Sequence, residues 1–143
     1  MPRSLVDTDI LSELRRAVNR TVVTNAALYR LTEGRITISS VTVVEVVQGY
    51  QRIERDDLAR RFLVSLQDYE VLALDAEAGA LAGHIRGDLQ RAGQPIGWAD
   101  PLIAAIALRD GLTLVTGNTA HYQRIQAVGY PLRLANWRLP SAI

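Results

Sequence analysis

The hydrophobic positions of this chain fall into short, nearly uninterrupted runs separated by longer segments of helical period. Four runs rich in branched residues, at 5–6, 36–38, 71–74 and 112–115, predict strands. A strand that is apolar on both faces must lie between two layers. Strands of this kind that alternate with helices indicate a parallel sheet with helices on both faces.

The clearest helical segment is expected to begin at Asp75, as N-cap, and to end at Gly93. Its apolar residues recur every three or four positions from Ala78 to Leu89. A second helix should start near Asp100 and run through Ala107, and shorter helices are expected at 10–14 and 58–66.

Residues 41–47 allow two interpretations. Their valines favour a strand, whereas Ser39 or Ser40 is a suitable N-cap and the valine spacing suits one helix face. We predict a helix here. The whole chain, residues 1–143, is then expected to form a single α/β domain with a central parallel sheet of about four or five strands flanked by helices.

The amino-acid composition excludes several kinds of site and reaction. The chain has 143 residues, 48% of them hydrophobic, and its longest apolar run (102–108) is far shorter than the ~20 residues of a membrane helix. No signal peptide is visible, so we expect a cytoplasmic protein without membrane attachment. There is no cysteine, and all 16 basic residues are arginine. Disulfides, thiolate metal sites and lysine-dependent Schiff-base or phosphate-loop chemistry are therefore excluded.

Acidic side chains stand where strands are expected to end. Asp7 and Asp9 follow the first strand, Glu45 lies among valines, and Asp100 precedes an apolar helix. Each acid also has a purely structural interpretation: Asp7 and Asp100 as N-caps, Asp9 as a first-turn residue, and Glu45 as a solvent-facing helix residue. Ligands nevertheless gather at the carboxyl ends of parallel strands, and the polar turn at 116–119 lies at such an end.

Three carboxylates, from Asp7, Glu45 and Asp100, would repel one another if they converged there. A divalent cation removes that repulsion, and oxygen ligands without cysteine suit Mg²⁺ or Mn²⁺ rather than zinc. Such an ion activates water and neutralises charge on a phosphoryl group. The spacing alone does not show that the three acids meet.

Four segments resemble one known family. They are LVDTDIL at 5–11, TVVEVVQG at 42–49, PIGWADPLIAA at 95–105 and LVTGNT at 114–119. In this order and spacing they resemble the motifs of PIN-domain ribonucleases. Their combination is similar to the VapC toxins of type II toxin–antitoxin modules, and the resemblance covers essentially the whole chain.

The resemblance implies a three-layer PIN-like fold and an endoribonuclease that depends on Mg²⁺ or Mn²⁺. It assigns metal binding and water activation to Asp7, Glu45 and Asp100, with Thr8, Thr116 and Asn118 as polar helpers. It also implies an RNA substrate, a homodimer, and a cognate VapB-type antitoxin that forms a heterotetramer or larger complex with the toxin.

The chain departs from the family pattern at two positions. His121 stands where many relatives carry a fourth acid, three residues after Asn118. Neutral histidine is a weak Mg²⁺ ligand, though it can contact phosphate or carry a proton; otherwise His121 is a surface residue. We therefore expect one tightly held metal. Asp9 replaces an asparagine that is common there, and it compensates for the missing acid only weakly, if at all.

Two neighbouring features have two interpretations each. Arg86 and Arg91 are candidates for contacts with RNA phosphates, or they belong to a solvated helix face with Asp88 as local partner. Trp98 either stacks on a base or packs in the core.

Two other functions are compatible with parts of this pattern. A haloacid-dehalogenase-type phosphatase would use Asp7 and Asp9 as its acid pair. That family's usual lysine is missing, the chain leaves little room for a cap domain, and Glu45 would have no role. A PIN-like module that binds RNA or protein without cutting is the second alternative, since the fourth acid is absent. The RNA target cannot be read from the sequence.

Overall fold

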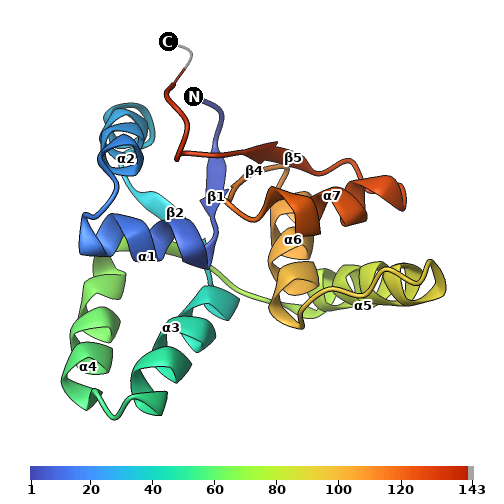
Figure 1. The fold of residues 1–143 in the computed structure, drawn as a ribbon, viewed down its shortest axis with the longest axis horizontal. Coiled ribbons are helices and arrows are strands. Elements are labelled where there is room, and N and C mark those ends of the chain that lie inside the picture. Colours follow the sequence, from blue (N-terminus) through green and yellow to red (C-terminus); the bar gives the residue numbers. More distant parts are fainter. Residues whose placement is uncertain (142–143) are drawn as a thin grey trace.

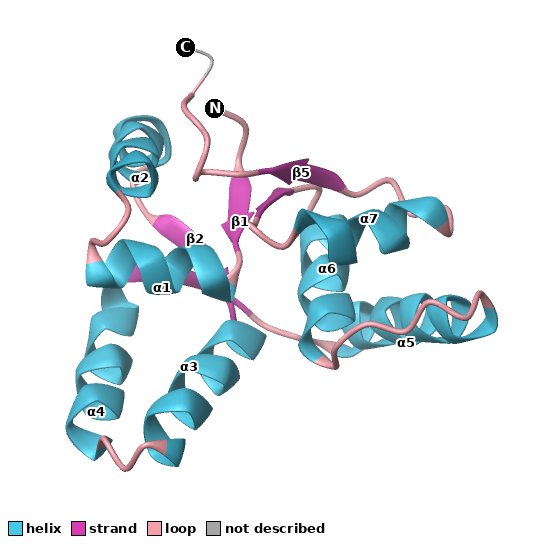
Figure 2. Ribbon diagram, viewed as in Figure 1, coloured by secondary structure: helices cyan, strands magenta, loops and turns pink. Residues whose placement is uncertain are grey.

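The computed structural model describes residues 1–141, in which seven α-helices and one short 3₁₀ helix surround five strands (Figures 1 and 2). In chain order the elements are β1 (Ser4–Val6), α1 (Thr8–Arg16), α2 (Arg20–Glu33), β2 (Ile36–Ser39), α3 (Ser40–Arg52), α4 (Asp56–Ser65), η1 (Leu66–Asp68), β3 (Tyr69–Leu72), α5 (Ala76–Arg91), α6 (Ala99–Arg109), β4 (Thr113–Val115), α7 (Thr119–Ala127) and β5 (Arg133–Ala135).

Every hydrogen-bonded strand pair is parallel, and β1 lies beside β2, so the strands follow the order β3, β2, β1, β4, β5. Their hydrogen bonds form two sheets rather than the continuous sheet that we expected, β1-β4-β5 and β2-β3. The cause lies at β1, where the backbone N–H of Ser4 donates to the Tyr29 hydroxyl at 3.0 Å and that hydroxyl also lies 3.4 Å from the Ser4 carbonyl. A side chain of α2 therefore takes the backbone groups that would otherwise pair with β2.

Two hydrophobic cores lie on opposite faces of the strands. Leu5 and Leu114 pack with α5, α6 and α7, whereas their neighbours Val6 and Val115 pack with α1 and α2. This distribution follows from the period-two geometry of a strand, in which successive side chains point to opposite faces. The predicted α/β arrangement of helices on both faces of a parallel sheet is thereby confirmed.

Local signals placed several helices correctly. Asp75 caps α5 by accepting from the Ala78 N–H, and Ser39 caps α3 by accepting from the Thr42 N–H, which settles the ambiguous valine segment as a helix. The N-cap interpretation of Asp100 is wrong: α6 begins at Ala99, so Asp100 lies within the first turn.

Other elements were missed or displaced. The third strand runs from Tyr69 to Leu72, two residues earlier than predicted. Neither α2 nor β5 was predicted. The β5 strand has only three residues, of which Arg133 is exposed, so it carries too little apolar pattern to be recognised. Within residues 1–141, none of the helices combines the length and apolar character needed to cross a bilayer.

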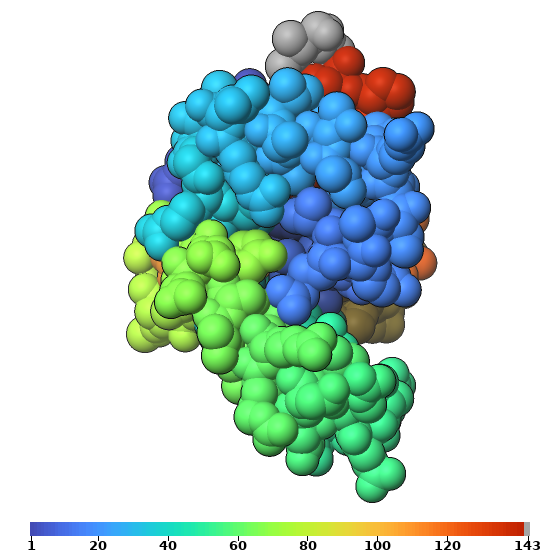
Figure 3. All heavy atoms as spheres, turned by 90° about the vertical axis from the view of Figure 1, so that its left-hand side faces the viewer, coloured from blue at the N-terminus to red at the C-terminus, as the bar shows by residue number. Residues whose placement is uncertain are grey.

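The helices α3 and α4 form a pair that projects from the rest of the molecule. In the space-filling view they extend as the teal and green lobe below the blue surface of α1 and α2 (Figure 3). The first turn of α3 remains buried, with Val41 3% exposed and Thr42 fully covered, whereas Val44 is 51% exposed further along. One end of α3 is thus anchored at the strands while the other reaches into solvent.

Candidate active site

Asp7 is the most buried acid of the site, with 5% of its surface exposed. It follows β1 directly and caps α1, since Oδ1 accepts the Thr8 N–H at 2.9 Å. Its Oδ2 accepts from the hydroxyls of Thr116 (2.8 Å) and Tyr122 (3.1 Å). Burial, and next the charge of Asp9, raise the pKa of Asp7 to about 7. The capping role and the candidate catalytic role fall on the same side chain.

Tyr122 connects two of the predicted site residues. Its hydroxyl lies 3.1 Å from Oδ2 of Asp7 and 3.3 Å from Oδ1 of Asp100, and the residue is fully buried on α7. Burial, with the two nearby carboxylates, raises the pKa of Tyr122 well above its ordinary value. The hydroxyl therefore keeps its proton and acts as a neutral link between the two acids.

Glu45 reaches the same region from α3. Its Oε1 accepts the Thr8 hydroxyl at 2.6 Å, and the Thr8 oxygen lies 3.0 Å from the Thr42 hydroxyl. A threonine has one hydroxyl proton, so Thr8 donates to Glu45 and accepts from Thr42. Ser39 donates in turn to Thr42 at 3.3 Å. A chain of three hydroxyls therefore ends on the Glu45 carboxylate and orients it.

The charge state of Glu45 depends on opposing effects. Burial raises the pKa of Glu45, the hydrogen bond from Thr8 lowers it, and the charges of Asp100 and Asp9 raise it. Asp100 likewise contributes to raising the pKa of Asp7. Asp7 and Asp100 thus lie on the same Tyr122 hydroxyl, and the charge of Asp100 acts on Glu45 as well. That all three acids hold one ion stays a prediction.

The turn after β4 supplies the remaining polar groups. The hydroxyl of Thr116, fully buried, donates to Asp7 and accepts the backbone N–H of Asn118 at 3.0 Å. His121 Nδ1 lies 3.0 Å from Oδ2 of Asp100 and 2.8 Å from Nδ2 of Asn118. One ring nitrogen cannot donate to a carboxylate and accept from an amide at the same time, so the tautomer of the His121 ring decides which bond forms.

Asp9 has a structural role. Its Oδ1 accepts the Ile10 N–H at 2.7 Å and its Oδ2 accepts the Gly117 N–H at 2.9 Å. Arg138 lies 3.4 Å from the same Oδ2 and pairs with Glu13 at 3.0 Å. The guanidinium also packs directly against Gly117, where no side chain intervenes. Asp9 therefore ties α1 to the polar turn and to the C-terminal segment.

Two basic candidates stand apart from the acids. Arg86 donates to the carbonyl oxygen of Trp98 at 3.4 Å and so supports the loop that leads into α6. Arg91 pairs with Asp88 at 2.6 Å on an exposed face of α5, as in its solvated interpretation. Trp98 is 48% exposed and does not belong to either core.

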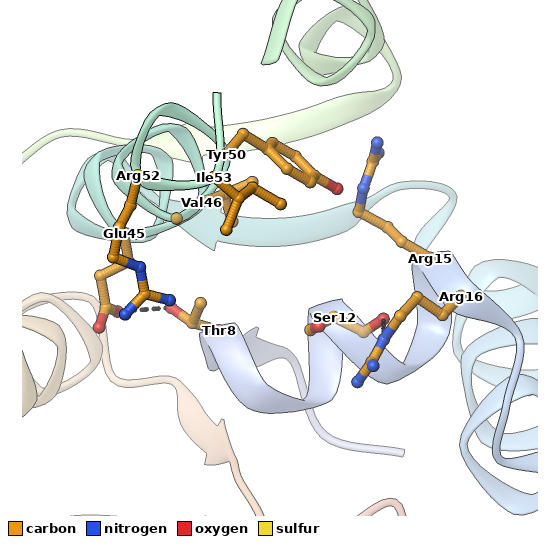
Figure 4. A pocket seen from close by; sticks show the side chains of 10 residues that line it. Thr8, Ser12, Arg15, Arg16, Glu45, Val46, Tyr50, Arg52 and Ile53 are labelled. Carbon is orange, nitrogen blue, oxygen red and sulfur yellow. Dashed lines mark hydrogen bonds between the residues drawn. The ribbon is translucent and has the colours of Figure 1, made fainter. Parts of the chain in front are cut away.

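A groove opens beside Glu45, between α1 and α3 (Figure 4). It encloses about 420 Å³. Arg15 and Arg16 extend from the α1 side, while Tyr50 and Ile53 form the α3 side. The hydrogen-bonded pair of Thr8 and Glu45 closes one end (Figure 4). The groove therefore joins an acidic end to a basic and partly apolar wall.

The carboxylate oxygens of Asp7, Asp100 and Glu45 are candidate ligands for a divalent cation. Within residues 1–141, no three acidic, histidine or cysteine side chains are already grouped as a metal site. Mg²⁺ commonly uses one or two carboxylates and completes its octahedron with water and substrate oxygens. Asp7 and Asp100, which the Tyr122 hydroxyl joins, and the nearby Glu45 offer only hard oxygen atoms. The residues present fit such an ion.

Sequence reasoning found the acids and the polar turn but missed Tyr122 and Thr42. Tyr122 follows His121 on a nine-residue helix, where an aromatic residue indicates only core packing. Thr42 was quoted within a motif without a role, and its contact with Thr8 spans 34 positions. The available signals were that Tyr122 directly follows His121 and that Thr42 lies three positions, or about one helical turn, before Glu45.

Comparison with known proteins agrees with this arrangement. Residues 4–127 match the PIN domain family, and the chain belongs to that family. A curated relative from Shigella flexneri, described as a tRNA(fMet)-specific endonuclease VapC, is 34% identical over 113 residues, which cover 76% of this chain and 80% of the relative. The resemblance to VapC proteins is thereby confirmed.

Solved structures extend the similarity over nearly the whole chain. A DNA-bound VapBC complex from Salmonella typhimurium contains a chain with 27% identity and a TM-score of 0.78, covering 96% of this protein and 99% of that chain. A VapBC2 complex from Rickettsia felis, bound to a promoter DNA fragment, gives 26% identity and a TM-score of 0.78, covering 94% and 98%. The fold is therefore that of toxins solved together with their antitoxins.

Proposed function

We propose that this chain is the ribonuclease toxin of a type II toxin–antitoxin module and that it cleaves RNA with the help of a divalent cation, Mg²⁺ or Mn²⁺. The observation that carries the proposal is the link between Asp7 and Asp100 through Tyr122, next to Glu45. A buried Asp7 beside the half-buried Asp100 and Glu45 costs free energy that a bound cation would offset.

Asp7, Asp100 and Glu45 would hold the metal. When bound there, a divalent cation lowers the pKa of a coordinated water and neutralises charge that develops on the phosphoryl group. The protein orients the acids: Tyr122 and Thr116 hold Asp7, His121 holds Asp100, and Thr8 holds Glu45. Because the Glu45 carboxylate is aimed by a hydroxyl chain, it is the residue we expect to accept a proton from the attacking water.

The antitoxin would cover the acidic site and the groove. The groove leads from Glu45 past arginines to an apolar wall, and exposed apolar residues continue along the projecting pair of helices at Val44, Ile53, Leu63 and Val64. A partner segment with apolar residues and acidic side chains fits this surface. The homodimer and the heterotetramer expected from the resemblance remain predictions, which light scattering with and without the antitoxin will test.

The decisive experiment follows cleavage of a mixed, fluorescently labelled RNA pool by partner-free protein with Mg²⁺, with Mn²⁺ and with EDTA. Asp7→Asn and Asp100→Asn should abolish cleavage while circular dichroism shows an unchanged fold. Asp68→Asn, at an exposed acid on η1, is the matched control and should cleave normally. Cleavage in EDTA, or by the Asp7 variant, contradicts the proposed mechanism.

The same experiment addresses the alternative functions. RNA binding without cleavage under any metal condition supports a non-catalytic PIN-like module. The phosphatase alternative, in which Asp9 is a general acid, is disfavoured because two backbone amides and Arg138 already surround its carboxylate. Addition of the purified cognate antitoxin in equal amount should suppress the metal-dependent cleavage.

A further inference from the structure

A second cavity adjoins the acidic site on the side of α3 that faces Trp98. It encloses about 240 Å³ and is lined by Glu45, Gln48, Gly49, Arg52 and Trp98. It shares Glu45, Gly49 and Arg52 with the larger groove, so the two cavities are neighbours along α3. A ligand in this cavity would lie directly beside a residue of the proposed active site.

The α3 wall of the cavity follows from helix spacing. Glu45, Gly49 and Arg52 are separated by four and then three residues and therefore lie on one face. Gly49 has no side chain, and a Cβ added there would meet nothing within 4 Å. The glycine thus leaves open space on this face of the helix. Figure 4 shows the Arg52 side chain running alongside Glu45 toward the end of the groove.

Trp98 also lines the cavity and is 48% exposed, although tryptophan has the largest of the apolar side chains. The other tryptophan, Trp137, is only 5% exposed. The loop before α6 is held at two points, by Arg86 on the Trp98 carbonyl and by Arg124 on the Pro95 carbonyl. Trp98 directly precedes α6 and lies two residues before Asp100, so the cavity and the acidic site share this helix start.

Arg52 has a free guanidinium. Within residues 1–141 it forms neither a hydrogen bond nor an ion pair, whereas Arg109 and Arg138 are both engaged by carboxylates. An exposed indole and an unpaired guanidinium that line the same cavity suit one nucleotide of a single strand, because the base can stack on the ring and the phosphate can bind the cation. Gln48 adds an amide that is able to bond to a base edge.

We propose that this cavity is a nucleotide subsite, in which Trp98 stacks on an unpaired base of single-stranded RNA and Arg52 binds an adjacent phosphate. The subsite rests on the proposed ribonuclease function, because it places the flanking nucleotide next to Glu45. RNA cleavage then requires an unpaired base near the cleaved bond, because a base within a duplex is already stacked on both faces and cannot stack on Trp98.

The test measures binding separately from cleavage. The Asp7→Asn protein is titrated with short single-stranded RNA and with the same sequence as a duplex. Single-stranded RNA should quench the fluorescence of Trp98, while the buried Trp137 contributes a constant background. The duplex should quench far less. Equal quenching by both forms, or none by either, overturns the proposal.

Substitutions separate stacking from simple contact. In the Asp7→Asn background, Trp98→Ala should weaken RNA affinity by about five- to hundredfold, the usual loss for one stacked base. Trp98→Phe retains an aromatic face and should lose little, whereas Trp98→Leu should behave like alanine. Arg52→Ala should weaken binding and reduce its salt dependence. Arg30→Ala, at an exposed arginine on α2 outside both cavities, is the matched control.

Abasic RNA makes the assignment specific. If one base stacks on Trp98, removing that base weakens binding to the parent protein but adds nothing to the loss in Trp98→Ala. Additive losses at every abasic position contradict the subsite. If the Trp98→Ala variant keeps its RNA affinity but loses antitoxin affinity, the subsite is overturned and this surface is a protein-docking site. Cleavage that needs Asp7 but not Trp98 would leave the proposed function intact and overturn only the subsite.

Discussion

The hydroxyl of Tyr122 lies 3.1 Å from Oδ2 of Asp7, although 115 positions separate the two residues. The same hydroxyl lies 3.3 Å from Asp100. A neutral hydrogen-bond donor thus stands between two acids that repel each other. Since the hydroxyl has a single proton, it serves both carboxylates fully only when one of them is itself protonated.

Tyr122→Phe removes this hydroxyl and retains the ring. We expect the free energy of unfolding to fall by about 1–2 kcal/mol, because buried Asp7 loses a donor. Divalent-metal affinity should fall by about tenfold, as is usual when a group that orients ligands is removed. Urea unfolding and titration calorimetry with Mn²⁺ measure the two effects. Tyr130→Phe, whose hydroxyl donates to Asp88 on α5, is the control and should leave metal affinity unchanged.

The stability of the metal-free protein should decrease between pH 4 and pH 7. Burial and the Asp9 charge raise the pKa of Asp7 from 3.8 to about 7, so the folded state binds more protons than the unfolded state across this interval. The stabilisation is complete below pH 4 and lost as the pH passes 7. It amounts to at most about 4 kcal/mol. Urea unfolding in EDTA at a series of pH values will show it.

Asp7→Asn should flatten this pH profile and make the metal-free protein more stable than the parent at pH 8. The neutral amide keeps most of the contacts and avoids the cost of a buried charge. A parent profile that rises from pH 4 to pH 7, or an Asn variant with the same slope, would contradict the explanation. The comparison needs no catalytic activity.

Thr8→Val should reduce cleavage by about ten- to hundredfold, because Glu45 loses the hydroxyl that aims it. The pH profile gives a second measure. The Thr8 bond lowers the pKa of Glu45, so its loss should move the acid limb of the rate profile to higher pH. Thr8→Ser retains the hydroxyl and should stay near the parent in both rate and profile. Equal rates in the valine and serine variants would exclude an orienting role.

The parent protein should bind one Mn²⁺ per chain, because His121 stands in place of a fourth acid. His121→Asp adds a carboxylate next to Asp100 and Asn118, and we expect it to raise the stoichiometry to two. Isothermal titration calorimetry measures this number directly. His84→Asp adds the same charge on the exposed face of α5 and should leave the stoichiometry at one. Two ions bound by the parent would refute the single-metal expectation.

The sequence was informative where local chemistry determines structure. Asp75 and Ser39 cap the helices that were predicted for them, and the short branched runs locate most of the strands. The acids at strand ends were found because parallel strands place their carboxyl ends together. These signals need only a few neighbouring residues, so one sequence is enough to read them.

Long-range contacts were not predictable in the same way. The Tyr29 hydroxyl interrupts the sheet by binding Ser4, 25 positions away, and nothing near Tyr29 indicates this. Asp100 combines a helix first turn with contacts to His121 and Tyr122, which only the tertiary fold brings together. Each of these features depends on where a side chain ends after packing rather than on its position along the chain.

The C-terminal segment has a consequence for the order of events during synthesis. Asp9 and Arg138 are 129 positions apart, and buried Asn25 holds the carbonyls of Trp137 and Leu139 at 3.0 and 2.9 Å. A nascent chain shorter than 138 residues therefore lacks the contact that joins α1 to this segment. One shorter than 122 residues also lacks the hydroxyl that links Asp7 to Asp100, so the acids are brought together late in synthesis.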